Sequence, residues 1–394
     1  MKVLFITPYY YPNVLGGSER SVKMLAEGLV KKGVDVNVLS FDGKNKNSRQ
    51  EIIENVKVIR KRLIKIKPNT LAQNLSLLLN HRAVRDINPD IIHVYNTWHI
   101  PSAYFFKNKK TKVVATLNNY FPVCPISYTK NNLMEREKFT LASMYLSIRE
   151  TFGKENIKNT FLAIPYTLYW KAVYYPSKRL DCFIPISRTT GKIYALQGFN
   201  KNKIRPVYNL FDKEFTKVEK RTRLKNYVIY VGGLLDSKGV LDLVEAFKYV
   251  KNKEIKLFLI GGGNLFDKIN SMKKDISKNI FLLGKLDHKQ LKEYYLKCSF
   301  TVHPSLWPDP FPRVLLEILK YNVPVLAADN PVAKEVLGNS AVFYERGNLK
   351  DLARKIDLMA AGKLKSDVQQ ARKRIFSFNP INEIYGIYQD LLKK

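Results

Sequence analysis

Acidic residues are scarce in this sequence, as are cysteines and long apolar runs. Its 394 residues include 34 Asp and Glu against 67 Lys and Arg, so the formal net charge is +33. The three cysteines have no paired spacing, which argues against a disulfide framework and a structural zinc site. No apolar run approaches the roughly eighteen residues that a membrane span needs. The first residues, MKVLFITPYY, lead straight into a predicted strand instead of a signal peptide, so we expect a cytoplasmic protein.

The positive charge favours an anionic partner, and the candidates are nucleic acid, an anionic membrane face or phosphate-bearing substrates. The basic residues lie in small scattered groups, among them residues 57–67, 107–112 and 217–225. They form no zinc finger, RRM signature or long basic tail, which disfavours a specific nucleic-acid partner. A general Lys-rich bias without any partner would give the same count.

The first forty residues predict a strand–helix–strand unit. KVLFITPYY is typical of a buried strand, a helix from about Ser18 keeps apolar residues at helical spacing, and VDVNVLS is the next strand. Gly16 and Gly17 lie in the turn between strand and helix, where the lack of a side chain lets a ligand approach the backbone. A tight connection without any ligand would also use two glycines.

Strand-to-glycine turns recur in the second half of the chain. YVIYVGGLLDSKGVLDLVEAF predicts a strand, a glycine turn and a helix, while IKLFLIGGGNL and NIFLLGKLDHKQL each predict a further strand followed by a glycine turn. Lys238 lies just before the helix, so its ammonium group and the free helix N–H groups can act together on a diphosphate. The alternation of strands and helices favours an α/β fold with parallel sheets.

The stretch from Phe300 to Ala328 carries the strongest functional pattern. It predicts a strand at 300–303, a proline-rich loop at 304–312, a helix from about Arg313 and a strand at 323–327. The prolines preset the backbone for a first helical turn, and the free N–H groups of such a turn suit an anion.

Two carboxylates lie on either side of that helix start, Asp309 in the loop and Glu317 in the helix. A carboxylate accepts two hydroxyl hydrogen bonds at once, so this pair beside an anion site suits a nucleotide sugar, which carries vicinal hydroxyl groups next to phosphates. The alternative is that Asp309 caps the helix and Glu317 is a solvated helix charge.

This stretch resembles the most recognisable motif of glycosyltransferase family 4, the retaining nucleotide-sugar transferases of GT-B fold. The matching residues are Pro304, Ser305, Asp309, Phe311 and Glu317. The segment GGSERSVKMLAEGLVKKGVDVNVLS is similar to the N-terminal signature of that family. The resemblance extends over nearly the whole chain and is most specific at residues 14–40 and 228–330.

The resemblance implies two Rossmann-like domains that face each other across a cleft. Residues 1–208 would form the acceptor-binding domain and residues 209–375 the nucleotide-sugar-binding domain. A C-terminal helix at residues 376–394 would cross back to the first domain.

The resemblance also implies roles for individual residues. Asp309 would hold hydroxyl groups of the donor sugar, Glu317 the ribose and Lys238 the diphosphate. The implied catalytic residues are Lys238, Asp309 and Asn118. The implied donor-binding residues are Gly16, Gly17, Lys238, Gly284, Lys285, Asp309, Phe311, Pro312, Arg313 and Glu317. The implied acceptor-binding residues are Glu19, Arg20, His93, Asn96 and Asn118. No cofactor and no metal are implied, because helix amides and Lys238 would neutralise the departing diphosphate.

The donor motif departs from the family pattern at three positions. Asp309 stands where Glu is usual, which shortens the side chain by one methylene, and Pro312 stands where Gly is common. Gly233 occupies the position at which family members usually have an arginine for the diphosphate. Arg313 or Arg20 would then supply the missing cation.

The first domain departs from the family at Asn118 and Asn119, where members commonly end a strand with His-Asp. An amide donates and accepts hydrogen bonds but carries no proton in catalysis. Three alternatives follow: His93 or His99 compensates, another group does, or no compensation is needed. A lone histidine on a strand is more often a structural residue.

Residues 121–180 are aromatic, basic and poorly periodic. The uncharged segment Asn159–Trp170 is too short to span a membrane and is followed by KAVYYPSKR. One hypothesis places this region in the membrane interface, with Tyr and Trp as anchors and basic side chains at anionic headgroups. The other is a buried helix pair that covers the N-terminal sheet.

The predicted function is metal-independent, retaining transfer of a hexosyl group from a UDP- or GDP-sugar to a hydroxyl group of a glycan acceptor, in cell-surface polysaccharide biosynthesis. A lipid-linked acceptor and a peripheral position on the anionic cytoplasmic membrane face would explain the basic excess. The alternative, favoured by Asn118 and Gly233, is a noncatalytic basic scaffold of the same fold that binds membrane or nucleic acid.

Overall fold

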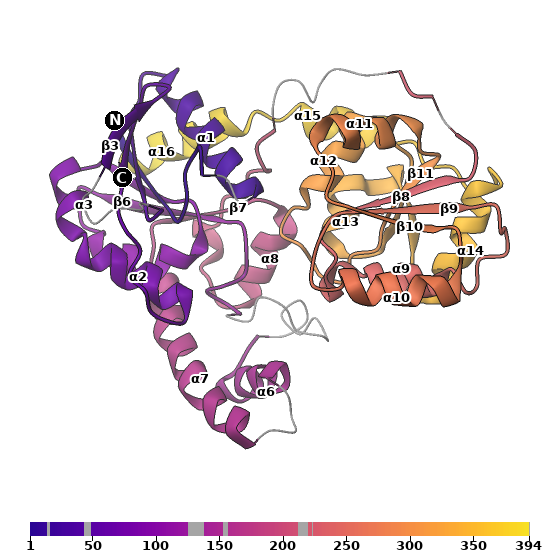
Figure 1. The fold of residues 1–394 in the computed structure, drawn as a ribbon. Helices are drawn as coiled ribbons and strands as arrows, with labels where there is room; N and C mark the ends of the chain where they lie inside the picture. The colour runs from indigo at the N-terminus through magenta and orange to yellow at the C-terminus, as the bar shows by residue number, and fades with distance from the viewer. Residues whose placement is uncertain are drawn as a thin grey trace. The chain divides into compact units, whose positions relative to one another are not determined.

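The computed structural model describes residues 1–13, 16–42, 49–124, 138–152, 157–211, 220–222 and 224–393, without the side chains of residues 49 and 150–162. The chain folds into two compact units (Figure 1). Unit 1 comprises Met1–Leu210 and Asn379–Lys394, and unit 2 comprises Phe211–Phe378. Part of the predicted basic group at 217–225 and part of the loop at 11–17 lie outside the described residues.

The described residues of unit 1 form a seven-stranded sheet in the order β3-β4-β2-β1-β5-β6-β7. Neighbouring strands are parallel except β3 and β4, which pair antiparallel. The strands are β1 (Lys2–Thr7), β2 (Asp35–Ser40), β3 (Arg49–Ile53), β4 (Val56–Arg60), β5 (Ile91–Val94), β6 (Lys112–Leu117) and β7 (Cys182–Pro185). The central strands are almost fully buried, as expected for a parallel sheet with both faces covered.

The helices of unit 1 come from both ends of the chain. They are α1 (Gly17–Val30), α2 (Asn69–Leu79), α3 (His81–Ile87), α4 (Ile100–Ala103), α6 (Leu141–Phe152), α7 (Ile157–Ser177), α8 (Arg188–Leu196) and α16 (Pro380–Leu392), with the 3₁₀ turns η1 (Thr97–His99), η2 (Tyr104–Phe106) and η3 (Lys201–Lys203). Helix α16 shares a core cluster with α1 and β1, in which Ile384 and Tyr388 are buried. Helix α16 is therefore part of unit 1.

The helix pair α6 and α7 projects from the body of unit 1 instead of lying over its sheet (Figure 1). Its ties to the rest of the unit come from the second half of α7, where the Trp170 indole donates to the Val123 carbonyl at 3.2 Å and the Tyr174 hydroxyl donates to the Gln197 carbonyl at 2.5 Å. Trp170 is only 4% exposed, so the prediction that this tryptophan anchors in a membrane interface is wrong. Among the described residues, no helix combines the length and apolarity needed to cross a bilayer.

The part of unit 2 that the structure describes forms a six-stranded, all-parallel sheet in the order β10-β9-β8-β11-β12-β13. Its strands are β8 (Tyr227–Val231), β9 (Lys256–Ile260), β10 (Ile280–Gly284), β11 (Phe300–His303), β12 (Val325–Ala328) and β13 (Val342–Tyr344). Its helices are η5 (Asp236–Lys238), α9 (Val240–Ala246), α10 (Phe266–Ile276), α11 (His288–Lys297), α12 (Arg313–Lys320), α13 (Pro331–Leu337), η6 (Gly338–Ser340), α14 (Leu349–Ala360) and α15 (Gln369–Phe376). The predicted strand at 300–303 and helix from Arg313 are confirmed, and they frame the loop at 304–312.

Candidate active site

In unit 2, glycine turns follow β8 and β9, and β10 ends in a glycine, so three backbones meet at one edge of the sheet. The Gly232 amide donates to the Ile260 carbonyl at 3.0 Å, and the Gly261 amide donates to the Gly284 carbonyl at 2.8 Å. Gly261 has a φ of +146°, and a Cβ atom there would lie 1.8 Å from the Gly232 carbonyl oxygen. Only glycine fits at this position, which leaves the edge lined by backbone that a ligand can approach.

The turn after β8 is tied to the loop at 304–312, which follows the neighbouring strand β11. The Ser237 carbonyl accepts from the Leu306 amide at 3.1 Å and from the Trp307 amide at 3.2 Å. Gly239 has a φ of +65°, and a Cβ atom there would lie 2.0 Å from the Pro304 carbonyl oxygen. These contacts fix Lys238 against the loop that carries the first predicted acid.

Lys238 and Asp309 form an ion pair, in which the Lys238 ammonium donates to Asp309 Oδ2. The Lys238 Nζ also lies 5.4 Å from the centre of the Trp307 ring. Both charged side chains are about one-fifth exposed, at 22% and 19%. Two of the three residues implied as catalytic are thus in direct contact, at the edge where the parallel strands end, which is where open α/β sheets bind ligands.

His303, the last residue of β11, lies buried behind this pair. Burial and then the nearby Lys238 ammonium lower the pKa of His303 to about 4, so the imidazole is neutral at pH 7. Its Nε2 atom has no hydrogen-bond partner among the described residues. A buried neutral ring here adds no competing charge to the ion pair.

Glu317 is held by a residue that the sequence did not indicate. The Tyr295 hydroxyl, from α11, donates to Glu317 Oε2 at 2.8 Å. Tyr295 is fully buried and its ring stacks on Tyr321 with centroids 5.1 Å apart. Because Tyr295 is anchored on both sides, it orients one oxygen of the carboxylate and leaves the other for a ligand.

The remaining predicted donor residues lie around the start of α12 and at the end of β10. Phe311 and Pro312 are buried, so they shape the loop through packing, and Arg313 is the first residue of α12. Gly284 has a φ of +71°, and Lys285 is exposed with its chain lying over Gly262. The structure therefore brings Lys238 and Asp309 into contact. Gly284 and Lys285 lie at the end of β10, which β9 and β8 separate from β11 and the Asp309 loop.

In unit 1, the predicted groups at the start of α1 are occupied locally. Glu19 Oε2 accepts from the Gly16 amide at 2.7 Å, and Oε1 accepts from the Ser18 hydroxyl at 2.7 Å. This is a helix cap, and it leaves Glu19 only 5% exposed. Gly16 has an extended backbone that any residue adopts, while Arg20 is exposed beside it.

Asn118 and Asn96 lie at the edge where β6 and β5 end. The Asn118 side-chain amide donates to the Tyr95 carbonyl at 3.1 Å, and its buried Oδ1 has no partner among the described residues. Asn96 accepts from the Trp98 amide at 3.2 Å and so caps the turn η1. Asn118 therefore has an unpaired but buried acceptor atom, whereas Asn96 has a structural role.

His93 is a structural residue, and the prediction that it binds the acceptor is wrong. It is fully buried, its Nδ1 contacts the Tyr388 hydroxyl and its Nε2 lies 2.7 Å from the Thr116 hydroxyl. His99, the other candidate to compensate for Asn118, is also fully buried and stacks on Phe41. Burial lowers the pKa of both imidazoles to about 3. Neither ring can exchange a proton with a ligand near pH 7.

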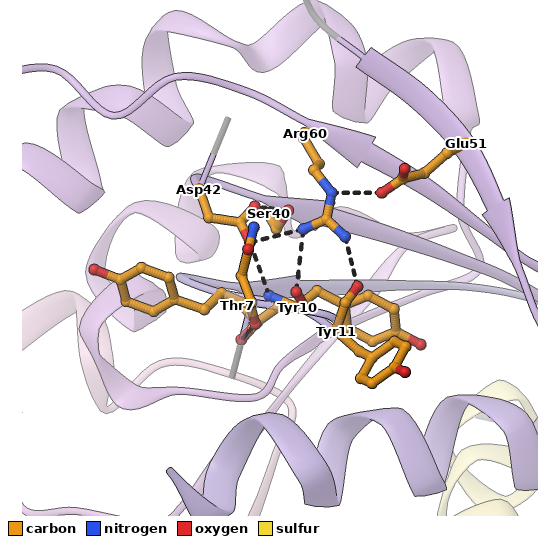
Figure 2. A network of polar contacts seen from close by, with 9 residues as sticks. Thr7, Tyr10, Tyr11, Ser40, Asp42, Glu51 and Arg60 are labelled. Carbon is orange, nitrogen blue, oxygen red and sulfur yellow. Dashed lines mark hydrogen bonds and ion pairs between the residues drawn. The ribbon is translucent and has the colours of Figure 1, made fainter. Parts of the chain in front are cut away.

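A buried arginine organises the other side of the unit 1 edge (Figure 2). Arg60, at the end of β4, pairs with Glu51 at 2.5 Å and with Asp42 at 2.7 Å, and it donates to the Tyr10 and Tyr11 carbonyls at 3.1 and 2.5 Å. Burial alone lowers the pKa of Arg60, but Glu51 and Asp42 more than offset this and raise it. The network clamps the turn after β1 to β2 and β4. Sequence reasoning placed Arg60 in a scattered basic group and missed this role.

The chain matches two family profiles that together span most of its length. The profile described as Glycosyltransferase Family 4 matches residues 15–215, and the profile described as Glycosyl transferases group 1 matches residues 212–375. Among curated relatives, an uncharacterized 42.6 kDa protein in the cps region of Klebsiella pneumoniae is 25% identical over 344 residues, which covers 81% of this chain and 83% of that protein.

A second relative is the capsular polysaccharide biosynthesis glycosyltransferase CapM of Staphylococcus aureus, 28% identical over 185 residues, or 43% of this chain and 47% of that protein. Among solved structures, Anabaena HepE in complex with UDP and glucose is similar with a TM-score of 0.66 at 16% identity, covering 99% of both chains. At that identity the likeness shows the fold, which is the predicted GT-B architecture of two Rossmann-like domains.

Proposed function

The chain is a member of glycosyltransferase family 4, and from this premise we propose that it moves a sugar from a UDP- or GDP-sugar to a hydroxyl group of a glycan acceptor. The observation that carries the donor assignment is the Lys238–Asp309 pair at the carboxyl edge of the unit 2 sheet, with Glu317 oriented on the adjoining helix. This arrangement offers a cation for a diphosphate and carboxylates for hydroxyl groups within one loop system.

Each of these residues then has a distinct task. Lys238 and the first turn of α12 neutralise the charge that grows on the leaving diphosphate, so no metal is required. Glu317 accepts both ribose hydroxyl groups. Asp309 accepts hydroxyl groups of the donor sugar through Oδ1, which has no partner among the described residues, while Oδ2 stays with Lys238.

We further propose that the transfer retains the configuration at the anomeric carbon, as in the family that the chain resembles. The acceptor hydroxyl attacks from the side of the leaving group, whose phosphate oxygen takes the proton, so no protein base is needed. Asn118, which stands where family members commonly have a histidine, carries no proton, in keeping with a transfer that needs no protein base. The anomeric coupling constant of the glycoside product, measured by NMR and compared with that of the donor, tests retention.

The relatives support an acceptor in surface polysaccharide assembly, since one is encoded in a cps region and another is named for capsular polysaccharide biosynthesis. An acceptor of this kind built on a lipid carrier would be reached at the cytoplasmic membrane face. Helix α7 supports such a position, because Ile164, Leu168 and Tyr175 form an exposed apolar stripe, 49%, 60% and 49% exposed. Lys171 lies on the same exposed side, so the stripe suits an anionic lipid surface.

Calorimetry with UDP and GDP tests the donor assignment. We expect one of the two to bind in the micromolar range and the corresponding nucleotide sugars to raise the melting temperature of the protein. The alternative function, a noncatalytic scaffold, is favoured by Gly233 and Asn118, and it predicts that neither nucleotide binds. Nucleotide binding without transfer to any hydroxyl acceptor, water included, would also favour the scaffold.

Co-sedimentation with vesicles tests the membrane position. The double variant Leu168→Ser/Lys171→Glu should release the protein from anionic vesicles, and raised salt should do the same. The matched control is Leu79→Ser/Lys109→Glu, which changes an exposed leucine and an exposed lysine elsewhere in unit 1. If wild-type protein binds neutral and anionic vesicles equally, the acceptor is better sought in solution.

A further inference from the structure

Unit 1 contains a cavity of about 700 Å³. None of the residues that carry the family resemblance lines this cavity. It opens where β2 and β4 end, and its lining runs from Tyr9 and Phe41 to the segment at residues 62–67 and the first residue of α2, Asn69. Half of the ten lining residues are apolar or aromatic, namely Tyr9, Phe41, Leu63, Ile64 and Ile66. Ligand sites typically combine such a lining with a few well-placed polar groups.

The polar groups of this cavity are predominantly cationic. Arg62, Lys65 and Lys67 all line it and are exposed. No ion pair of the described residues involves any of the three. Three neighbouring cations without an acid repel one another, and an anion in the cavity relieves this repulsion.

The acid in the lining, Asp42, does not cancel this charge. Its Oδ2 is 2.7 Å from Arg60 Nη1 and accepts from the Tyr10 amide at 3.2 Å, while Oδ1 accepts from the Ser40 hydroxyl at 2.6 Å. Asp42 is therefore part of the Arg60 network, which borders the cavity through this carboxylate (Figure 2). The cavity keeps an excess of positive charge.

Helix α2 adds a weaker attraction. It begins at Asn69 beside the three cations, and no side chain caps its first turn, because Pro68 occupies the N-cap position. An uncapped helix start carries partial positive charge and free N–H groups. The cations and the helix start thus act on the same part of the cavity.

We propose that this cavity binds a phosphate group of the acceptor, so that the enzyme acts on a phosphate-bearing glycan or lipid. A phosphate has up to two negative charges and three acceptor oxygens, which matches three cations and a helix start better than a carboxylate does. The aromatic and aliphatic wall takes the sugar ring or lipid chain next to the phosphate. This inference rests on the proposed transferase function, and it assigns the chemistry of the acceptor.

The test uses full-length protein saturated with the nucleotide diphosphate that it binds, so that the diphosphate site of unit 2 is occupied. Calorimetry then measures binding of inorganic phosphate, glucose 1-phosphate and geranyl phosphate. The variant is Arg62→Ala/Lys65→Ala/Lys67→Ala, and the control is Lys109→Ala/Lys110→Ala/Lys201→Ala, which removes three exposed cations from other surfaces of unit 1. All six side chains are exposed, so both variants should fold.

We expect wild-type and control protein to bind the organic phosphates equally, and the cavity variant to bind them at least tenfold more weakly with unchanged nucleotide affinity. Equal binding by the cavity variant, or no binding by wild type, overturns the proposal. Tighter binding of geranyl phosphate identifies a lipid source, and tighter binding of glucose 1-phosphate a glycan source. Equal affinity for all three probes overturns the role of the apolar wall.

If neither UDP nor GDP binds, the donor assignment is wrong. The same titrations without nucleotide still test whether the cavity binds phosphate. Loss of phosphate binding confined to the cavity variant then supports the site independently of the transferase function. The two failures are therefore distinguishable.

Discussion

The two units build their ligand-facing edges in different ways. In unit 2, glycine turns pack backbone against backbone, and Lys238, Asp309 and Glu317 project from well-fixed segments. In unit 1, Glu19 closes its own helix, and the cavity is lined by side chains without a recognisable motif. Many donors share the same nucleotide diphosphate, so a fixed backbone geometry can bind it. The acceptor differs from enzyme to enzyme and is bound by side chains, which are easily exchanged.

The largest difference in stability between the two units is expected when one methyl group is added to the unit 2 backbone. In Gly261→Ala, the new Cβ lies 1.8 Å from the Gly232 carbonyl oxygen at a φ of +146°. We expect a loss of about 3 kcal/mol or more in the free energy of unfolding, or no folded unit 2. Gly386→Ala in α16 of unit 1, where nothing lies within 4 Å, should be neutral or slightly stabilising. Equal melting temperatures of the two variants would contradict the backbone-encoded site.

The next largest effect is expected from Lys238→Ala. Charge grows on the leaving diphosphate toward the transition state, so kcat should fall by about 10²–10³ while donor affinity drops only modestly. The matched control is Lys334→Ala, which removes the lysine of an exposed ion pair with Asp329 in the same unit. A variant that loses donor affinity but keeps its maximal rate would show that another cation stabilises the leaving diphosphate.

Two glutamates near helix starts, one in each unit, are expected to differ in whether they affect ligand binding or stability. Glu317→Ala should weaken UDP or GDP binding by about 1.5–3 kcal/mol, because a two-hydroxyl contact is lost, and should leave the fold intact. Glu19→Ala removes a helix cap and should instead cost about 1 kcal/mol of stability without changing nucleotide affinity. Calorimetry and thermal melting measure both variants. The ribose assignment is wrong if Glu317→Ala binds like wild type.

The smallest predicted effect concerns pH and is confined to unit 2. Burial, and then Glu245, raises the pKa of Asp242 in α9 from 3.8 to about 6. Between these values the folded state binds more protons than the unfolded state, so this contribution to stability is complete below pH 4 and is lost as the pH rises through 6. Asp242→Asn should therefore stabilise the protein at pH 7 by about 1 kcal/mol, after allowance for solvent exposure of the carboxylate. Chemical denaturation at pH 4, 5.5 and 7 tests this, because the free energy of unfolding should depend less on pH in Asp242→Asn than in the wild type.

Much of unit 2 was predictable because its elements are short and strongly patterned. The strand at 300–303 and the helix from Arg313 have the predicted starts, since a β-branched run and a proline-rich loop mark them locally. The glycine turns were predictable for the same reason. The contact between Tyr295 and Glu317 was not, because it joins two helices and no local period reports it.

Unit 1 shows where local pattern misleads. Trp170 is flanked by tyrosines and lysines, which is typical of a membrane interface, yet it packs inside the unit while Leu168, two residues earlier, is exposed. Arg60 lies in a basic run that suggests a solvated face, but strand alternation turns it inward to Asp42 and Glu51. In both cases tertiary contacts decide which side of an element is buried, and a single sequence does not contain that information.

The place of α16 in unit 1 also bears on how the chain is made. Unit 2 is inserted in the sequence between η3 and α16 of unit 1, so all of unit 2 leaves the ribosome before α16 does. Until Tyr388 emerges, the His93 ring lacks one of its two hydrogen-bond partners, and the apolar face of α1 lacks the side chains of Ile381 and Ile384. Unit 2 can thus fold during synthesis, whereas unit 1 is completed only once α16 has emerged, and a chaperone that shields its open core would act in that interval.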